Sequence, residues 1–371
     1  MTLPSLAFAA AGVALIAIIV WDAFETVLVP RRIGRRVRLT RYFYLVTWRL
    51  WRGLARSLPT PSRREALLGV FGPLSLIVLL LCWASGLILG FALLGLASNV
   101  GLAVHGFGVL LYTSGQTFFT LGYGDFAPST MPGRLLAVLE SGLGFGFLGT
   151  VVGYLPTLYA AFSQREIEIS LMDARAGSPP TAAEFMRRIP KLADGRCDDV
   201  LAAWERWAAQ LLETHISYPQ LAYYRSQHSN QSWLAALVTI LDSTAVLLAR
   251  PGASRASQAG LTFAVARHAL VDITQVFVRD YRPLAGERLS PQTLRTIAAV
   301  LAPENPGEFE QRLAELRLLY EPYARALGAY LLLELPPWEH PRPRHDNWER
   351  APWDKLLAAR AESVHAADDH F

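Results

Sequence analysis

The sequence predicts an all-α membrane protein with three membrane-spanning helices, one re-entrant segment and an α-helical domain outside the bilayer. Two observations lead to this fold class. Long uncharged apolar runs lie in residues 1–164, and helix-like spacing of apolar residues continues through residues 165–371. The acids follow the same division, because residues 1–164 hold only five of the 31 acids in the chain. We therefore expect an integral membrane half joined to an aqueous half.

Residues 1–30 are predicted to form the first spanning helix. No charged residue occurs from Ser5 to Trp21, and the apolar character continues to Val29, so the run can cross a bilayer with modest tilt. A cleaved signal peptide carries basic residues before its apolar region, whereas here the basic cluster follows it. We expect a retained helix with its N-terminus outside.

Residues 31–65 are predicted to form a cytoplasmic, arginine-rich linker. Residues 31–64 contain eleven arginines and no acid, and a short loop of this charge is typical of the cytoplasmic side. At 100° per residue the linker resembles an amphipathic helix on the inner leaflet, where anionic lipid attracts arginine. Five arginines on one face are the lipid-contact candidates: Arg38, Arg41, Arg49, Arg52 and Arg56.

The same region also has the arginine spacing of a voltage sensor, with one at every third position: Arg32, Arg35, Arg38 and Arg41. Pro30 and Gly34 weaken such a helix, and only one spanning segment precedes it. We therefore favour lipid contact over voltage sensing. Asp22 and Glu25 lie one turn apart near the end of the first helix, and we expect them to pair with these arginines.

Two further spanning helices are predicted in residues 66–164. One covers about residues 66–97, and the other covers residues 135–164, in which Glu140 is the only charged residue. The arginine-rich linker fixes their direction, because it places the start of the first helix and the end of the second inside the cell. Residues 165–371 are then cytoplasmic.

Residues 106–124 are uncharged as well, but polar residues and glycines are too frequent there for a lipid-facing helix. Irregular backbone at membrane depth survives only where protein or a water-filled cavity surrounds it. This segment is therefore predicted to re-enter from the outside between the last two spanning helices.

The hexad Thr-Leu-Gly-Tyr-Gly-Asp occupies residues 120–125. It resembles the selectivity filter of potassium channels, usually written TVGYGD. The resemblance covers residues 66–163 in the order outer helix, pore helix, filter and inner helix, and implies a channel pore domain at residues 66–164. The chain holds one copy of the hexad, so a closed pore needs several chains, and the family implies a homotetramer. The departure is Leu121, where valine is usual; selectivity is expected to survive, with altered packing behind the filter.

Backbone chemistry supports the same interpretation. A dehydrated potassium ion needs a cage of oxygen atoms, which rings of backbone carbonyls supply. Gly122 and Gly124 adopt positive φ values without a Cβ penalty, and Thr120 adds a hydroxyl oxygen. The predicted filter is Thr120, Leu121, Gly122, Tyr123 and Gly124, with K+ bound at the first four of these residues. A glycine-rich turn without an ion site is the alternative.

Three residues are candidates for supporting the filter. Gln116 lies on the predicted pore helix, four residues before the filter, where the resemblance to potassium channels implies a bond toward Asp125; an amide bonded elsewhere is the alternative. Glu140 is an acid inside the inner helix, and intramembrane acids are costly and usually functional or paired. A protonated or hydrogen-bonded carboxyl that faces the pore helix is the other interpretation of Glu140.

The inner helix carries four candidates for a gate or hinge: Gly146, Gly149, Gly153 and Pro156. Small residues four apart permit close helix contact or bending, and the proline removes a backbone donor, so a kink is expected near the inner mouth. The glycines also match G-x-G-x-x-G over residues 144–149. That motif binds dinucleotides only between a strand and a helix, so we reject it here.

Residues 165–371 are predicted to form an all-helical domain. Apolar residues recur at helical spacing in five segments: residues 198–215, 231–249, 257–279, 290–302 and 308–335. No βαβ pattern is present, which argues against a Rossmann-type gating domain. The domain resembles the helical tails of bacterial ion-channel proteins at His215–Pro219 and Ser226–Trp233. Residues 336–371 are expected to form a surface wrap or a tail.

Two questions about this domain stay open at this level. It is either a gate element that an unknown ligand or protein biases, or a passive assembly collar. His215, Tyr218, Arg225 and His228 line either a ligand pocket or a packed helix–turn–helix joint, and we favour the joint.

Together these features predict a potassium-selective channel of the inner (plasma) membrane that conducts K+ passively and is not an enzyme. No cofactor other than pore K+ and no nucleic-acid partner is expected, and two cysteines exclude a disulfide scaffold. The main alternative is a non-conducting or weakly selective membrane sensor built on a channel pore. A transporter subunit carries four degenerate pore loops in one chain, which this sequence does not.

Overall fold

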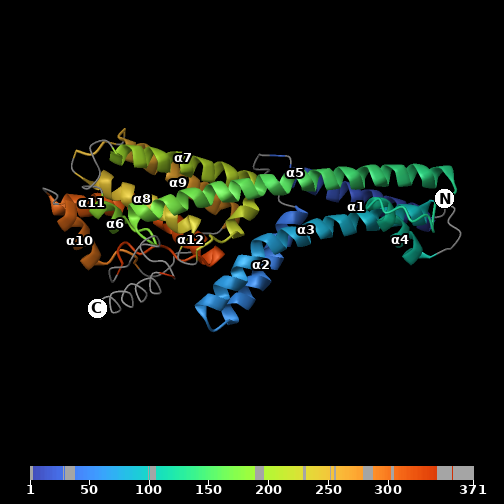
Figure 1. Cartoon of the computed structure of the whole chain (residues 1–371), viewed down its shortest axis with the longest axis horizontal. Coiled ribbons are helices and arrows are strands. Elements are labelled where there is room, and N and C mark those ends of the chain that lie inside the picture. The colour runs from blue at the N-terminus through green and yellow to red at the C-terminus, as the bar shows by residue number, and fades with distance from the viewer. Residues whose placement is uncertain are drawn as a thin grey trace, which may run out of the picture. The chain divides into compact units, whose positions relative to one another are not determined.

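The computed structural model describes most of the chain: residues 3–27, 29, 38–98, 100, 106–188, 196–228, 231–250, 252–254, 256–278, 287–301, 305–340 and 353. Within these residues there are twelve α-helices, one short 3-10 helix and no strand, so the all-α prediction is confirmed (Figure 1). Three helices are long and apolar enough to cross a membrane, as predicted. Of the predicted features, the arginines from Arg31 to Arg36 and most of the 341–371 tail lie outside the described residues.

The chain divides into two compact units. The first, called the membrane unit below, comprises Met1–Phe162 together with Ser217–Tyr224. The second, called the tail unit, comprises Ser163–Ile216 and Arg225–Phe371. The segment Ser217–Tyr224, called the strap below, therefore belongs to the membrane unit although the residues on both sides of it belong to the tail unit.

Glycines let the first two spanning helices approach closely. Helix α1 (Leu3–Val27) packs against α3 (Pro61–Ala97). A Cβ added at Gly12 would lie 2.7 Å from the carbonyl oxygen of Gly90, and one added at Gly86 would lie 2.3 Å from Ile19. Small residues at such positions permit the backbone contact on which helix association in a membrane depends.

Asp22 joins α1 to the N-terminus of α2 (Leu39–Ser57). Its carboxylate accepts bonds from the Thr40 backbone N–H at 3.1 Å, the Thr40 hydroxyl at 2.5 Å and the Trp83 indole at 3.0 Å. An acid at this place satisfies an unpaired helix N–H and complements the helix dipole. Of the two acids expected to pair with arginine, Glu25 contacts Arg38 at 3.5 Å, whereas Asp22 binds Thr40 and Trp83.

Helix α2 presents distinct faces to its surroundings. One face, which includes Trp48 and Ala55, is buried against the rest of the membrane unit. An opposite face is apolar and exposed: Leu39, Val46, Leu50 and Leu54. Among the arginines between these faces, Arg49 and Arg56 are exposed. This is the amphipathic pattern predicted for an interfacial helix.

The re-entrant helix and the last spanning helix complete the membrane unit. Helix α4 (Phe107–Phe118) is short and packs against α3. Helix α5 (Met131–Ala176) is longer than predicted and passes through Pro156 without interruption (Figure 1). It ends where Gly177 takes a φ of 90° and its N–H bonds to the Asp173 carbonyl, a common glycine helix ending.

The tail unit and the strap contain the remaining helices: α6 (Ala182–Arg188), α7 (Arg196–Ser217), η2 (Pro219–Tyr223), α8 (Trp233–Ala249), α9 (Gln258–Phe277), α10 (Pro291–Leu301), α11 (Pro306–Leu318) and α12 (Glu321–Leu331). Helix α8 is buried along almost its whole length and forms the core. The predicted segment 308–335 forms two helices, α11 and α12. Pro322 lies in the first turn of α12, where proline favours the start of a new helix. Helix α6 was not predicted.

Candidate functional site

The hexad follows directly from the C-terminus of the pore helix α4. The N–H of Leu121 bonds to the Gln116 carbonyl at 2.8 Å, and the N–H of Thr120 bonds to the Thr117 carbonyl at 3.1 Å. These bonds close the last turn of α4. The chain then leaves the helix at Thr120, so the start of the hexad is held in register with the pore helix.

The hexad backbone alternates in conformation. Gly122 has a φ of 63° and Gly124 a φ of 78°, as the glycines led us to expect. Thr120 also has a positive φ, 56°, which is rare for a β-branched residue and was not predicted. Leu121 and Tyr123 between them keep negative values. Positive φ at every second residue permits successive carbonyl groups to face the same side, and backbone outliers of this kind cluster at functional sites.

A side-chain bond connects the two ends of the re-entrant segment. The amide nitrogen of Gln116 donates to a carboxylate oxygen of Asp125 at 3.0 Å. Gln116 is buried on α4, while Asp125 closes the hexad. The structure thus brings these two candidates together. The bond joins a residue four positions before the filter to the residue directly after it.

Glu140 makes its contact with a residue that the sequence analysis did not single out. It is buried on α5 and lies within hydrogen-bond distance of the Ser114 hydroxyl on α4. The same hydroxyl lies 2.8 Å from the carbonyl oxygen of Ile88 on α3. Glu140 therefore faces the pore helix, and Ser114 is the meeting point of three helices.

Gly144 is the second residue that the sequence analysis did not identify as important. A Cβ placed there would lie 2.0 Å from the carbonyl oxygen of Phe118, at the end of α4. Only glycine allows α5 to pass the pore helix at this distance. At the predicted hinge glycines Gly146, Gly149 and Gly153, by contrast, an added Cβ would meet none of the described residues within 4 Å.

The inner part of α5 is packed in a different way. Tyr154 and Leu158 form an apolar cluster with Leu76 of α3 and Leu221 of the strap. Leu221 has no exposed surface. One directional bond accompanies these contacts, from the Gln220 amide to the Tyr154 hydroxyl. The strap thus lies against the segment of α5 that contains Pro156.

Aromatic rings hold the strap to α2 and α3. Tyr223 stacks on Tyr44 with the ring centroids 5.5 Å apart, and it also contacts Trp48 at 5.0 Å and Phe71 at 5.2 Å. The ring of Tyr224 covers Gly72, where an added Cβ would approach it to 2.7 Å. The strap therefore contacts all three membrane-unit helices at this level, namely α2, α3 and α5.

The residues flanking the strap form a packed joint. His215 is fully buried, its Nδ1 lies 2.9 Å from the Leu211 carbonyl, and its ring packs on Trp233 at 4.8 Å. Burial and the nearby Arg165 lower the pKa of His215 to about 3, so the ring is neutral. Arg225 binds the carbonyl groups at the end of α12. These contacts favour the joint over a ligand pocket.

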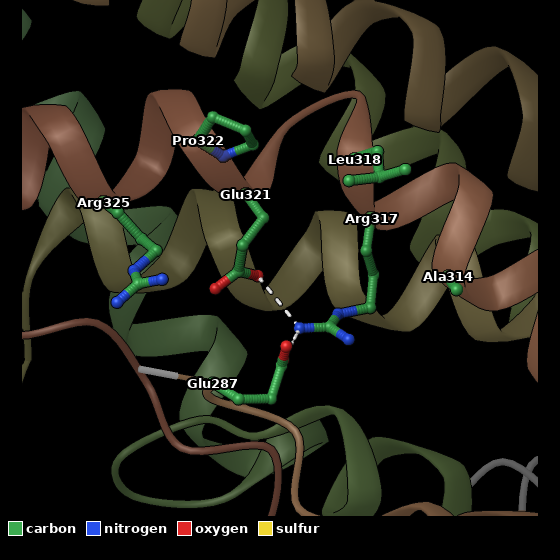
Figure 2. A pocket seen from close by; sticks show the side chains of 7 residues that line it. All are labelled: Glu287, Ala314, Arg317, Leu318, Glu321, Pro322 and Arg325. Atoms are coloured by element: carbon green, nitrogen blue, oxygen red, sulfur yellow. Dashed lines mark hydrogen bonds and ion pairs between the residues drawn. The ribbon is translucent and has the colours of Figure 1, made fainter. Parts of the chain in front are cut away.

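The tail unit also has a cavity of about 300 Å³ beside α11 and α12 (Figure 2). Arg317 points into it between Glu287 and Glu321, and Arg325 lies at its edge (Figure 2). The two acids balance the two arginines, so the cavity carries no net charge. Among the described residues no group of histidine, cysteine or acidic side chains is arranged to hold a metal ion.

Comparison with known proteins agrees with this geometry. A family model described as "Ion channel" matches residues 77–160. This range contains the second half of α3, all of α4, the hexad and residues 131–160 of α5. The match supports an ion channel located in a membrane, and it favours a transport protein over an enzyme.

One curated relative has no known function. The chain is 26% identical over 206 residues to the Uncharacterized membrane protein YdjJ of Bacillus subtilis (strain 168). The match covers 53% of this chain and 58% of that protein, so the chain spans less than two thirds of the length of the relative. No solved structure matches the chain significantly. The similarity to YdjJ supports the membrane location only.

Proposed function

We propose that the protein is one subunit of a homotetrameric, potassium-selective channel that conducts K+ passively. The observation that carries the proposal is the positive φ at Thr120, Gly122 and Gly124 in a hexad at the end of a pore helix. The backbone carbonyl groups of Thr120, Leu121, Gly122 and Tyr123 from the four subunits form rings of oxygen atoms that replace the hydration shell of the ion. The ion is the cargo of the protein, and no cofactor is required.

The tetramer is proposed because one hexad supplies only one side of an ion cage. Leu121 and Tyr123 are 54% and 70% exposed in the single chain. Helix α5 also exposes large apolar residues along its length: Leu135, Val138, Leu139, Phe145, Leu148 and Val152. A second copy of the chain covers these side chains in the proposed assembly, and close helix contact is compatible with Gly142 and Gly146.

Gating is proposed at the inner half of α5, around Gly153 and Pro156. The strap packs against this half, and it is continuous in sequence with the tail unit at both of its ends. A rearrangement of the tail unit would therefore pull on the strap as well as on α5. Whatever biases the tail unit shifts the gate by its difference in affinity for the open and closed states.

Helix α2 is proposed to lie on the inner leaflet and to contact anionic lipid. Its apolar face is exposed, and its arginines lie between that face and the buried one. In this proposal the apolar side chains face acyl chains, and Arg49 and Arg56 face head groups. The proposed orientation has the N-terminus outside and the C-terminus in the cytoplasm.

Flux measurements on purified protein in liposomes test the proposed function. Vesicles loaded with K+ should release it down a gradient, while vesicles loaded with Na+ should not. Native mass measurement of the same preparation should give four chains. Absence of flux for both ions would favour the non-conducting sensor, and equal flux would favour a non-selective channel.

A further inference from the structure

We propose that Glu140 is a positioning residue for the pore helix: a neutral carboxylic acid that donates a hydrogen bond to Ser114, which in turn donates to the carbonyl of Ile88. This chain of two bonds ties α5 to α4 and α4 to α3. The inference deepens the proposed channel function and rests on it where it concerns conduction.

The Ser114 hydroxyl has one proton but contacts two oxygen atoms, and this is the first argument for a protonated Glu140. The Ser114 oxygen lies 2.8 Å from the carbonyl oxygen of Ile88 and within bonding distance of a Glu140 carboxyl oxygen. A hydroxyl has one proton to donate, and a carbonyl oxygen can only accept. If Ser114 donates to Ile88, the proton between Ser114 and Glu140 must come from Glu140. The opposite assignment leaves two oxygen atoms 2.8 Å apart with no proton between them.

The surroundings of Glu140 provide the second part of the argument, because no cation among the described residues lies beside it to balance a carboxylate. Glu140 is only 4% exposed. On α4 the only titratable group is Tyr112, and on α3 from residue 66 onward it is Cys82. On α5 the nearest charge is Arg134, about 9 Å away along the helix, exposed and bonded to the Pro128 carbonyl. A buried carboxylate without a partner is costly, so the neutral acid is favoured.

Other acids of the membrane unit are engaged by their own partners. Asp125 accepts from Gln116, Asp22 from Thr40 and Trp83, and Glu25 from Trp21. None of these bonds involves Glu140. The proton on Glu140 is therefore shared with Ser114 alone among the described side chains.

The two hydrogen bonds lie close to the hexad, which explains how they would affect conduction. Ser114 lies two residues before Gln116, whose carbonyl accepts the N–H of Leu121 and whose side chain binds Asp125. A displacement of α4 at Ser114 is thus passed directly to both ends of the hexad. Loss of the Glu140 proton introduces a buried charge at this junction and removes the donor.

The expected pH dependence follows from the sign of this change. The neutral form supports the filter at neutral and acidic pH, and raising the pH until Glu140 ionises should reduce K+ conduction. Glu140→Gln keeps a donor toward Ser114 but cannot ionise, so it should conduct at neutral pH and lose this alkaline decline. Glu140→Ala and Ser114→Ala remove the bond, and about a tenfold loss of K+ flux is expected for each.

Infrared spectroscopy of the intact wild-type tetramer in liposomes, compared with Glu140→Gln, tests the protonation state without reference to conduction. The account predicts a protonated-carboxyl band at neutral pH that is present in the wild type and missing in Glu140→Gln. Absence of that band would overturn the inference, even if the protein conducts K+. A band without any K+ flux would support the neutral acid and contradict the channel function instead. Loss of flux in Glu140→Gln equal to that in Glu140→Ala would contradict the positioning role.

Discussion

The outer and inner halves of the spanning part of α5 are held by different kinds of contact. The outer half bonds to the pore helix through Glu140 and touches its backbone at Gly144, where Phe118 allows no side chain. The inner half packs mainly through Tyr154 and Leu158 against apolar and aromatic side chains of α3 and the strap, with one hydrogen bond, from the Gln220 amide to the Tyr154 hydroxyl. Hydrogen bonds and backbone contacts fix a distance and a direction, whereas apolar contacts are non-directional.

In the proposed channel, this difference corresponds to the two tasks of a gated pore. The filter requires a fixed backbone, and the outer half of α5 provides a fixed wall behind it. The proposed gate requires movement, and the inner half of α5 is held against the strap mainly by apolar contacts, which are non-directional. The following variants disturb the outer contacts, the hexad, the inner contacts and the lipid contact of α2, from the largest expected effect to the smallest.

Replacing Gly144 by alanine should have the largest effect, because its Cβ would lie 2.0 Å from the carbonyl oxygen of Phe118, a backbone atom and not the end of a flexible side chain. We expect a loss of stability of about 3 kcal/mol or more, typical of severe overpacking. Thermal unfolding of purified protein measures it. Gly69→Ala on α3 is the matched control, because no described residue lies within 4 Å of its Cβ; equal destabilisation of the two would contradict the fixed contact.

Replacing Gly122 by alanine should degrade potassium selectivity, because a Cβ disfavours its φ of 63° by about 1 kcal/mol or more in each subunit of the proposed tetramer. The permeability ratio of K+ to Na+ measures the effect. Gly115→Ala on the pore helix is the control, since it has open space and no positive φ. Unchanged selectivity in Gly122→Ala would argue that the backbone of the hexad does not bind the ion.

Replacing Leu221 by alanine should change the open probability of the channel and leave its selectivity intact. Leu221 is fully buried against the inner half of α5, and its truncation removes about 2–5 kcal/mol of packing. Single-channel recording separates the two properties. Leu318→Ala, at a position 73% exposed in the tail unit, is the control. A change of selectivity without a change of gating would reverse the roles assigned to the two halves.

Neutralising Arg49 and Arg56 with glutamine should have the smallest effect, about 1 kcal/mol of lipid attraction for each arginine. We expect weaker binding or activity in vesicles that contain anionic lipid and no change in neutral vesicles. Exposed arginines of the tail unit, Arg206 and Arg295, provide the control pair. Equal behaviour of all variants in both lipids would contradict the contact proposed for α2.

Periodicity and composition predicted much of the membrane unit. Uncharged runs identified α1, α3 and α5, because a bilayer requires long apolar helices. The arginine spacing identified α2, and the glycines of the hexad predicted two of its three positive φ values. Gln116 was placed with Asp125 through the resemblance to a known pore, and the structure joins them.

Other features depend on contacts between distant segments that sequence patterns do not encode. Ser114 is an ordinary polar residue of the pore helix until α3 and α5 are placed beside it. Gly144 differs from the neighbouring glycines only in facing Phe118. The strap lacks a helical pattern, so nothing in its sequence indicates that it packs in the membrane unit. Asp22 was assigned to arginine because charge is visible in a sequence, whereas a free helix N-terminus is not.

The central claim is that the hexad forms a potassium-selective filter in a tetramer of this chain. Reversal potentials recorded from purified wild-type protein in a planar bilayer, with K+ on one side and Na+ on the other, test it most directly. The account predicts a reversal potential close to that of a membrane permeable to K+ alone. A reversal potential near zero in a conducting preparation would contradict it.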